Sequence, residues 1–246
     1  VSDDCWQATP GKVVYLVRNL GIAAGGTVME DCRVLEACRE GKYTSVLVQT
    51  HDKKYVEYRT EHFVNALGSG AGKLCDSMGI DAGLYPVRHQ AFITRRLPML
   101  GKHGTNLDML IDRQDYKGFS AVYGQQIAYT GQIIGCASPK LDAMRIDKNL
   151  KVNTKAFLEI VSEMFSEWIP DLAGVGIQAV WAGYYTEPRY IVDPELGLFV
   201  GMRGHGFMLS QYIARMYVDK LLGRPVPEYF EKLKLNGPGL SEKAFK

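Results

Sequence analysis

The chain has 246 residues, of which 46% are hydrophobic and 23% charged, and its formal net charge is +2. These values are typical of a soluble globular protein and give no sign of a nucleic-acid partner or of binding to an acidic membrane surface. The apolar stretches are interrupted before they reach the roughly 18 residues that a membrane span needs. The five scattered cysteines lack zinc or redox spacing, which favours a reducing cytoplasm and predicts no metal site.

The first predicted element is an amphipathic helix over residues 10–22. Thr9 can cap it, Pro10 suits its first position, and apolar residues recur at helical spacing. Strands are expected next at 27–34, 45–51 and 55–60. Residues 61–80 are then expected to form a strand, a glycine-rich turn and a helix.

The rest of the chain predicts long strands with two helices. Helices are expected at 155–168 and 207–222, the second closed by Gly223. Because strands and helices do not alternate regularly, we expect an α+β or mixed α/β fold with a large, partly antiparallel sheet. The predicted strands are 85–97, 106–112, 119–126, 131–137, 176–186 and 197–202.

Two glycine-rich segments each lie between a predicted strand and a predicted helix. The first is not a P-loop, because only three residues separate Gly68 from Gly72 and Leu74 replaces the hydroxyl residue. The second, residues 201–206, has the spacing GxxGxG. Neither matches the GxGxxG dinucleotide fingerprint. Each is therefore either a close-approach surface for a ligand or a tight strand-to-helix turn.

Five segments resemble, in order, FAD-dependent amino-acid oxidoreductases of the sarcosine oxidase, glycine oxidase and D-amino-acid oxidase group. The resemblance runs from about Ala8 to Gly223, and residues 122–138 are most similar to sarcosine oxidase β-type and proline dehydrogenase β-type subunits. It implies a substrate-domain sheet with packed helices, plus the C-terminal part of an FAD-binding domain. The segments are PGKVVYLVRNLGIAAGGTVMEDCRV, VNALGSGAGKL, VYGQQIAYTGQIIGCAS, WAGYYTEP and GLFVGMRGHGFMLS.

The resemblance implies a non-covalently bound FAD. The segment from Gly204 to Met208 would lie against the flavin, and the following helix would point its positive end at the pyrimidine edge. Val34 would flank the adenosine, with Ala66 and Gly68 near the ribose and pyrophosphate. The expected cofactor residues are Val34, Ala66, Gly68, Gly204, His205, Gly206, Phe207 and Met208.

The resemblance also implies hydride transfer from an amino acid or N-methyl amino acid to the flavin, and it identifies no catalytic side chain. Met208 and Tyr185 stand where relatives carry cationic anchors for the substrate carboxylate. Arg203 is therefore the expected anchor, with Arg189 as second choice, and His89 is expected to be structural. The expected substrate-binding residues are Tyr123, Gln126, Tyr184, Tyr185 and Arg203.

The family's N-terminal GxGxxG unit has no counterpart in the sequence. We therefore expect a fragment of a longer polypeptide that is inactive alone. Residues 1–70 would mix elements of both domains, 71–180 would form the substrate domain, and 181–246 would return to the FAD domain. Oxidation of a 2-hydroxy acid or glycerol phosphate, and a non-catalytic assembly subunit, are alternative functions. A partner subunit or a homo-oligomer is the expected assembly.

Overall fold

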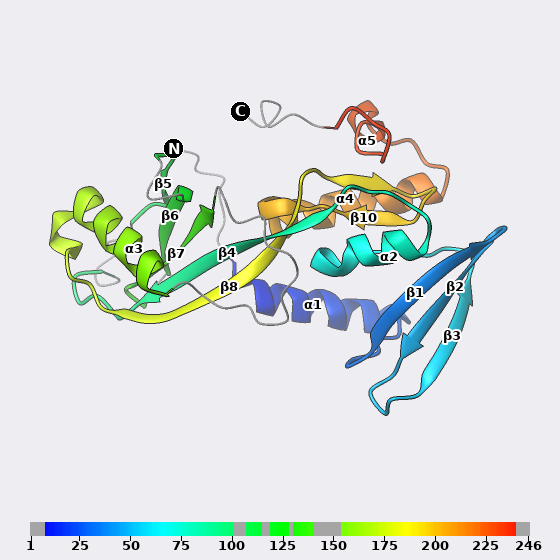
Figure 1. Ribbon diagram of the computed structural model, residues 1–246, viewed down its shortest axis with the longest axis horizontal. Helices are drawn as coiled ribbons and strands as arrows, with labels where there is room; N and C mark the ends of the chain where they lie inside the picture. Colours follow the sequence, from blue (N-terminus) through cyan, green and yellow to red (C-terminus); the bar gives the residue numbers. More distant parts are fainter. Residues whose placement is uncertain (1–7, 101–106, 115–118, 128–129, 140–153, 240–246) are drawn as a thin grey trace.

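The computed structural model describes residues 8–100, 107–114, 119–127, 130–139 and 154–239. Helices and antiparallel sheets are both present, which confirms the predicted α+β class (Figure 1). The helices are α1 (Pro10–Ala23), α2 (Ala71–Ser77), α3 (Thr154–Trp168), α4 (Gly206–Leu221) and α5 (Glu228–Glu231). The strands are β1 (Arg33–Glu40), β2 (Tyr43–Gln49), β3 (Tyr55–Thr60), β4 (Tyr85–Thr94), β5 (Leu110–Asp112), β6 (Phe119–Ile127), β7 (Gln132–Pro139), β8 (Ile177–Glu187), β9 (Ile191–Asp193) and β10 (Leu198–Val200).

The largest sheet has five antiparallel strands in the order β5-β6-β7-β4-β8. Strands β4 and β8 pair along almost their whole length, with Tyr85 opposite Glu187 and His89 opposite Gly183. In Figure 1 these two strands extend together from the sheet beside α3 toward α2 and α4. They therefore connect the half of the molecule that contains the five-stranded sheet and α3 with the half that contains α2 and α4.

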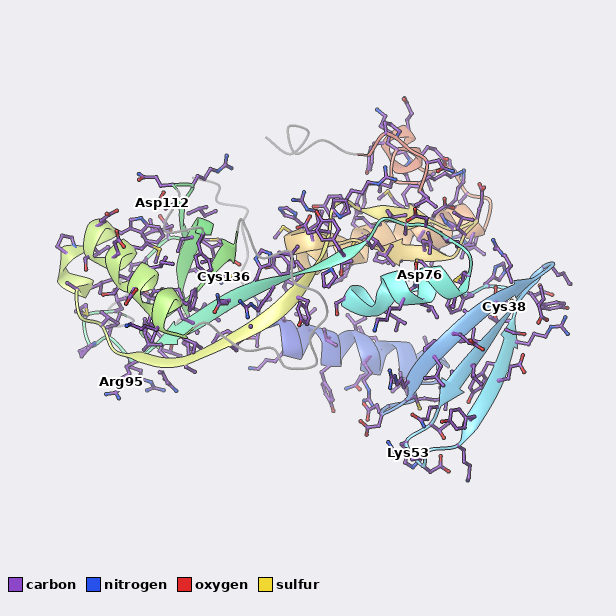
Figure 2. All side chains as sticks on the ribbon, in the orientation of Figure 1. Cys38, Lys53, Asp76, Arg95, Asp112 and Cys136 are labelled. Carbon is purple, nitrogen blue, oxygen red and sulfur yellow. The ribbon has the colours of Figure 1, made fainter. Side chains whose placement is uncertain are left out.

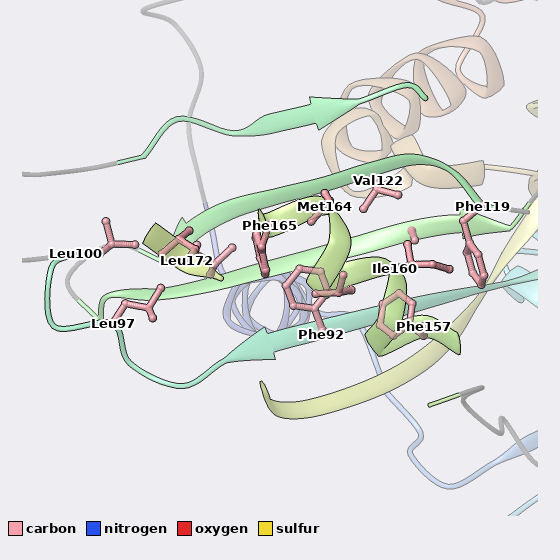
Figure 3. Close-up of a cluster of buried hydrophobic side chains, with 13 residues drawn as sticks. Phe92, Leu97, Leu100, Phe119, Val122, Phe157, Ile160, Met164, Phe165 and Leu172 are labelled. Carbon is pink, nitrogen blue, oxygen red and sulfur yellow. The ribbon is translucent and has the colours of Figure 1, made fainter. Parts of the chain in front are cut away.

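Helix α3 packs on one face of this sheet and forms the largest hydrophobic core (Figure 3). Phe92 of β4 and Val122 of β6 are fully buried beneath it, and the Phe92 ring meets Phe165 edge-on with centroids 5.4 Å apart. Side chains alternate between the faces of a strand. The neighbours of these core residues must consequently point to the opposite face of the sheet.

The other half contains the β1-β2-β3 meander, the β9-β10 hairpin and the four helices α1, α2, α4 and α5. Residues of α2 pack against the hairpin in a cluster that includes Cys75, Ile191 and Leu198. The strand predicted near residues 61–66 is reduced to one parallel bridge between Asn65 and Leu198. The Asn65 carbonyl accepts a 3.0 Å hydrogen bond from Phe199 N, so the glycine-rich turn begins beside the hairpin.

Helix α1 has the predicted bounds within a residue, but none of its residues is buried. The Thr9 side chain makes no cap hydrogen bond, contrary to the prediction; its carbonyl instead accepts from Lys12 N and Val13 N. Val13 of the predicted apolar stripe is half-buried, but six other large residues of the helix are at least 42% exposed: Val14, Tyr15, Leu16, Val17, Leu20 and Ile22. The described part of the chain thus leaves this face uncovered.

Several other predicted bounds were wrong. The strand expected at 27–34 begins only at Arg33 and continues to Glu40, and the strand expected at 106–112 is limited to β5. The short elements β9 and α5 were not predicted. Among the described residues, no helix combines the length and apolar character that crossing a membrane requires.

Candidate functional site

The face of the five-stranded sheet opposite α3 carries a group of polar side chains, which we call the site face. Because Val122 lies under α3, the next residue, Tyr123, points the other way. The register places Tyr123 opposite Cys136 and His89 opposite Gly183. The polar members of the site face include His89, Tyr123, Cys136, Tyr185 and Glu187.

Tyr123 connects the strands of the site face. The Cys136 thiol and the Tyr185 hydroxyl are near its hydroxyl and, after burial, contribute to the raised pKa of Tyr123. The Tyr185 ring in turn stacks on His89, with centroids 3.8 Å apart and planes 28° from parallel. Figure 2 shows Cys136 on the five-stranded sheet, distant from Cys38 on β1. Aromatic and polar contacts therefore hold residues of β4, β6, β7 and β8 together.

All of these groups except Glu187 are uncharged at neutral pH. Burial raises the pKa values of Tyr123 and Tyr185, and it raises the pKa of Cys136 to about 11. Burial, with a smaller contribution from the positive charge of Arg203, lowers the pKa of His89 to about 4. His89 Nδ1 is buried without a hydrogen-bond partner among the described residues. A neutral imidazole is thus presented beside two tyrosines.

The glycine-rich turn before α4 abuts this face. A Cβ atom at Gly204 would lie 2.9 Å from Cε2 of Tyr185, and one at Gly206 would lie 2.9 Å from Cβ of Met202. Gly201 has φ +71°, and a Cβ there would collide with the Arg189 carbonyl. The chain's own packing therefore demands these glycines. Of the two alternatives that the sequence left open, the tight strand-to-helix turn is therefore sufficient to explain them.

The outer surface of the same turn is open. Phe207 and Met208 are 43% and 67% exposed, and Gly204 and His205 are also exposed. The N-terminus of α4 has no side-chain cap and no acidic residue in its first turn. Its first backbone N–H groups and positive dipole end remain suited to an electronegative ring edge. His205 Nδ1 lies 2.5 Å from the Tyr190 hydroxyl. This contact fixes the orientation of the His205 imidazole ring.

The second expected cofactor region is ordered by Asn65. Its side-chain amide donates to the Ala71 carbonyl at 3.0 Å, and its side-chain oxygen accepts from Leu67 N at 3.2 Å. Ala66 and Gly68 are consequently held exposed, with Gly68 at φ +55°. Val34 lies apart from them, half-buried against the core cluster under β1 and β2.

Arg203 does not stand unpaired on the turn. It adopts φ +48°, a left-handed conformation that costs a non-glycine residue about 1–3 kcal/mol. Its Nε donates a 2.6 Å hydrogen bond to Oε2 of Glu187, and the two side chains are 27% and 16% exposed. The second-choice anchor, Arg189, donates to the carbonyls of Gly237 and Leu235. Both guanidinium groups therefore have protein partners.

Two expected substrate residues face away from the site. Gln126 is buried on the α3 side, where its Oε1 accepts a 2.8 Å hydrogen bond from Leu107 N. Tyr184 is adjacent to Tyr185 and opposite Arg88, so it belongs to the face that does not carry His89. The expectation placed neighbouring residues on one surface, which an extended strand does not permit.

Sequence reasoning missed His89, Cys136 and Glu187. The alternation of β4 could have placed His89 on the face opposite Phe92, but its proximity to Tyr185 depends on the β4–β8 register. Glu187 was not considered because its partner Arg203 is 16 residues away. Among the described residues, no three His, Cys, Asp or Glu side chains are grouped to hold a metal ion.

Comparison with known proteins agrees with this architecture. L-proline dehydrogenase from P. horikoshii superposes with a TM-score of 0.71 at 24% identity, covering 93% of this chain and 59% of that one. Iminodiacetate oxidase from Chelativorans sp. BNC1 gives 0.67 at 15% identity, covering 93% and 58%. Glycine oxidase from Geobacillus kaustophilus gives 0.62 at 17% identity, covering 85% and 54%.

The chain thus spans less than two thirds of each of these solved structures. No match is found among curated protein sequences. The family profile described as FAD dependent oxidoreductase matches residues 1–220. The chain belongs to the FAD-dependent oxidoreductase family.

Proposed function

We propose that the protein containing this chain oxidises the C–N bond of an amino acid or N-methyl amino acid. The observation that carries the proposal is the contact between Gly204 and Tyr185, which brings the glycine turn against a face of uncharged hydrogen-bonding groups. The names of the similar solved structures, which refer to proline, glycine and iminodiacetate, support an amine-containing substrate.

FAD, when bound, supplies the acceptor for the hydride. The turn from Gly204 to Met208 and the N-terminus of α4 would contact the isoalloxazine, where the helix dipole favours negative charge. The exposed segment that includes Ala66 and Gly68 would contact the ribose and pyrophosphate. Val34 would flank the adenosine.

Tyr123, Tyr185 and His89 would form the substrate side. A neutral imidazole accepts a hydrogen bond from an amine without repelling it, and the tyrosine hydroxyls can orient a polar substrate. Because these groups stay uncharged, they require no counter-ion when water is excluded. Gln126 and Tyr184, which lie on the other face, have no part in the proposed site.

We also propose a cytoplasmic location. The described cysteines Cys32, Cys38, Cys75 and Cys136 are all unpaired, which suits a reducing compartment. A thiol titration of the protein isolated under non-reducing conditions tests this. All five cysteines of the chain are expected to react as thiols after unfolding, and a disulfide among them would contradict it.

The function is tested by anaerobic reduction of the flavin in the protein at its natural length. Sarcosine, proline and glycine should bleach the flavin absorption, whereas lactate and glycerol phosphate should not. Tyr123→Phe should slow the bleaching, while the matched control Tyr55→Phe, at an exposed tyrosine on β3, should not. Bleaching by the hydroxy compounds alone would contradict the proposal. A protein that cannot retain FAD would instead support the non-catalytic alternative.

A further inference from the structure

The ion pair between Arg203 and Glu187 joins the end of β8 to the turn that precedes α4. Glu187 is the last residue of β8, and Arg203 is the first residue of the short 3-10 turn Arg203–His205. The contact is short, at 2.6 Å, and both side chains are largely shielded from water. Such a charge-assisted bond is stronger and more directional than one between neutral groups.

A second contact fixes the same two segments. Tyr185, two residues before Glu187, places its ring so close to Gly204 that no Cβ could be accommodated there without movement. The ring cannot easily retreat, because it stacks on His89 at 3.8 Å. The turn is therefore held to β8 at consecutive residues, Arg203 through charge and Gly204 through packing.

The backbone conformation of Arg203 also needs a cause. Among the described residues, only Asp31, Lys53 and Arg203 combine a side chain with a positive φ. Strain of this kind persists where surrounding interactions impose it. The bond from Arg203 Nε to Glu187 is a side-chain interaction that can impose it.

We propose that Arg203 is a positioning residue: its ion pair with Glu187 sets the turn Gly204–Met208 against β8, and Arg203 does not bind the substrate carboxylate. The proposal rests on the proposed function for its link to the flavin. A substrate carboxylate would have to share the guanidinium group with Glu187, a carboxylate already 2.6 Å from Nε. The positive charge acts on the site at longer range, where it helps to keep His89 neutral.

The positioning role is tested in the natural-length protein by hydrogen exchange at those amides of the turn and of α4 that donate hydrogen bonds, such as His205 N, which donates to the Met202 carbonyl at 3.1 Å. Glu187→Gln and Arg203→Asn should each accelerate exchange there about tenfold, the factor that corresponds to about 1.4 kcal/mol. Asparagine is chosen because it tolerates a positive φ. The control Arg215→Met breaks an exposed ion pair with Asp219 on α4 and should leave these amides unchanged. Unchanged exchange in both test variants would overturn the proposal.

The link to the flavin is tested separately by FAD titration and by kinetics. Both test variants should weaken FAD binding about tenfold, and the double variant should bind no more weakly than either single one, since the pair acts as a unit. KM for a carboxylate-bearing substrate should change little once FAD is saturating. If Arg203 binds substrate instead, Arg203→Asn raises KM, whereas Glu187→Gln lowers it. If the wild type binds no FAD, the proposed function fails while the exchange result still decides the positioning role.

Discussion

Replacing Gly204 by alanine separates the two reasons for a glycine at this position. A Cβ there would lie 2.9 Å from Cε2 of Tyr185, whereas ordinary contacts of this kind are 3.4 Å or longer. The ring is backed by His89, so the strain cannot be relieved by a free rotation. Overpacking of this size costs about 1–3 kcal/mol. We expect the free energy of unfolding of Gly204→Ala, measured in urea, to fall by that amount.

A double-mutant cycle with Tyr185→Ala identifies the source of the loss. Once the ring is removed, adding the Cβ at residue 204 should cost less than about 0.5 kcal/mol. Gly183→Ala is the matched control, because a Cβ at Gly183 has no neighbour within 4 Å. FAD affinity should still fall in the double variant if the flavin also contacts this backbone. An equal loss of stability with and without the Tyr185 ring would refute the packing argument.

Three further predictions concern two residues of the site face, Tyr123 and His89, and the difference between an exposed and a buried helix surface. Tyr123→Phe removes the hydroxyl that contacts Cys136 and should lower the free energy of unfolding by about 0.5–1.5 kcal/mol in urea; no change would show that the contact contributes nothing. Because folding lowers the pKa of His89 from 6.5 to about 4, the unfolded chain binds the proton more readily, and stability should fall as the pH drops through this window. Unfolding curves of His89→Gln should lack that component, and an identical pH dependence would contradict the assignment. In the 246-residue chain, Leu20→Ala on the uncovered face of α1 should cost less than about 0.5 kcal/mol, whereas Ile160→Ala under α3 should cost about 2–5 kcal/mol; similar losses would mean that α1 is covered.

Local patterns predicted the strongly periodic elements well. The apolar face of residues 155–168 corresponds to α3, and the expected strand 176–186 is within one residue of β8. Strand β1 was misplaced because half of its sequence, RVLEACRE, is charged and most of its side chains are exposed. Its position is decided by pairing with β2, a long-range contact that a local reading of β1 cannot supply.

The site was harder to predict, for a geometric reason. The resemblance assigned the turn before α4 and Tyr185 to one site, and the structure brings Gly204 close to Tyr185, but the resemblance did not distinguish the two faces of a strand. The twofold alternation of side chains separates Tyr185 from Tyr184 and would have excluded one of them. His89 and Glu187 enter only through the register of β4 with β8 and through the fold of the turn.

The central claim is that the turn before α4 and the site face enclose one flavin and substrate site. A crystal structure of the natural-length protein with FAD and a bound amino acid tests it most directly. The account predicts the isoalloxazine against the backbone of Gly204–Met208 and the amino acid beside His89, Tyr123 and Tyr185, with the Arg203–Glu187 ion pair intact. A flavin bound away from this turn, or a substrate carboxylate paired with Arg203 in place of Glu187, would contradict it.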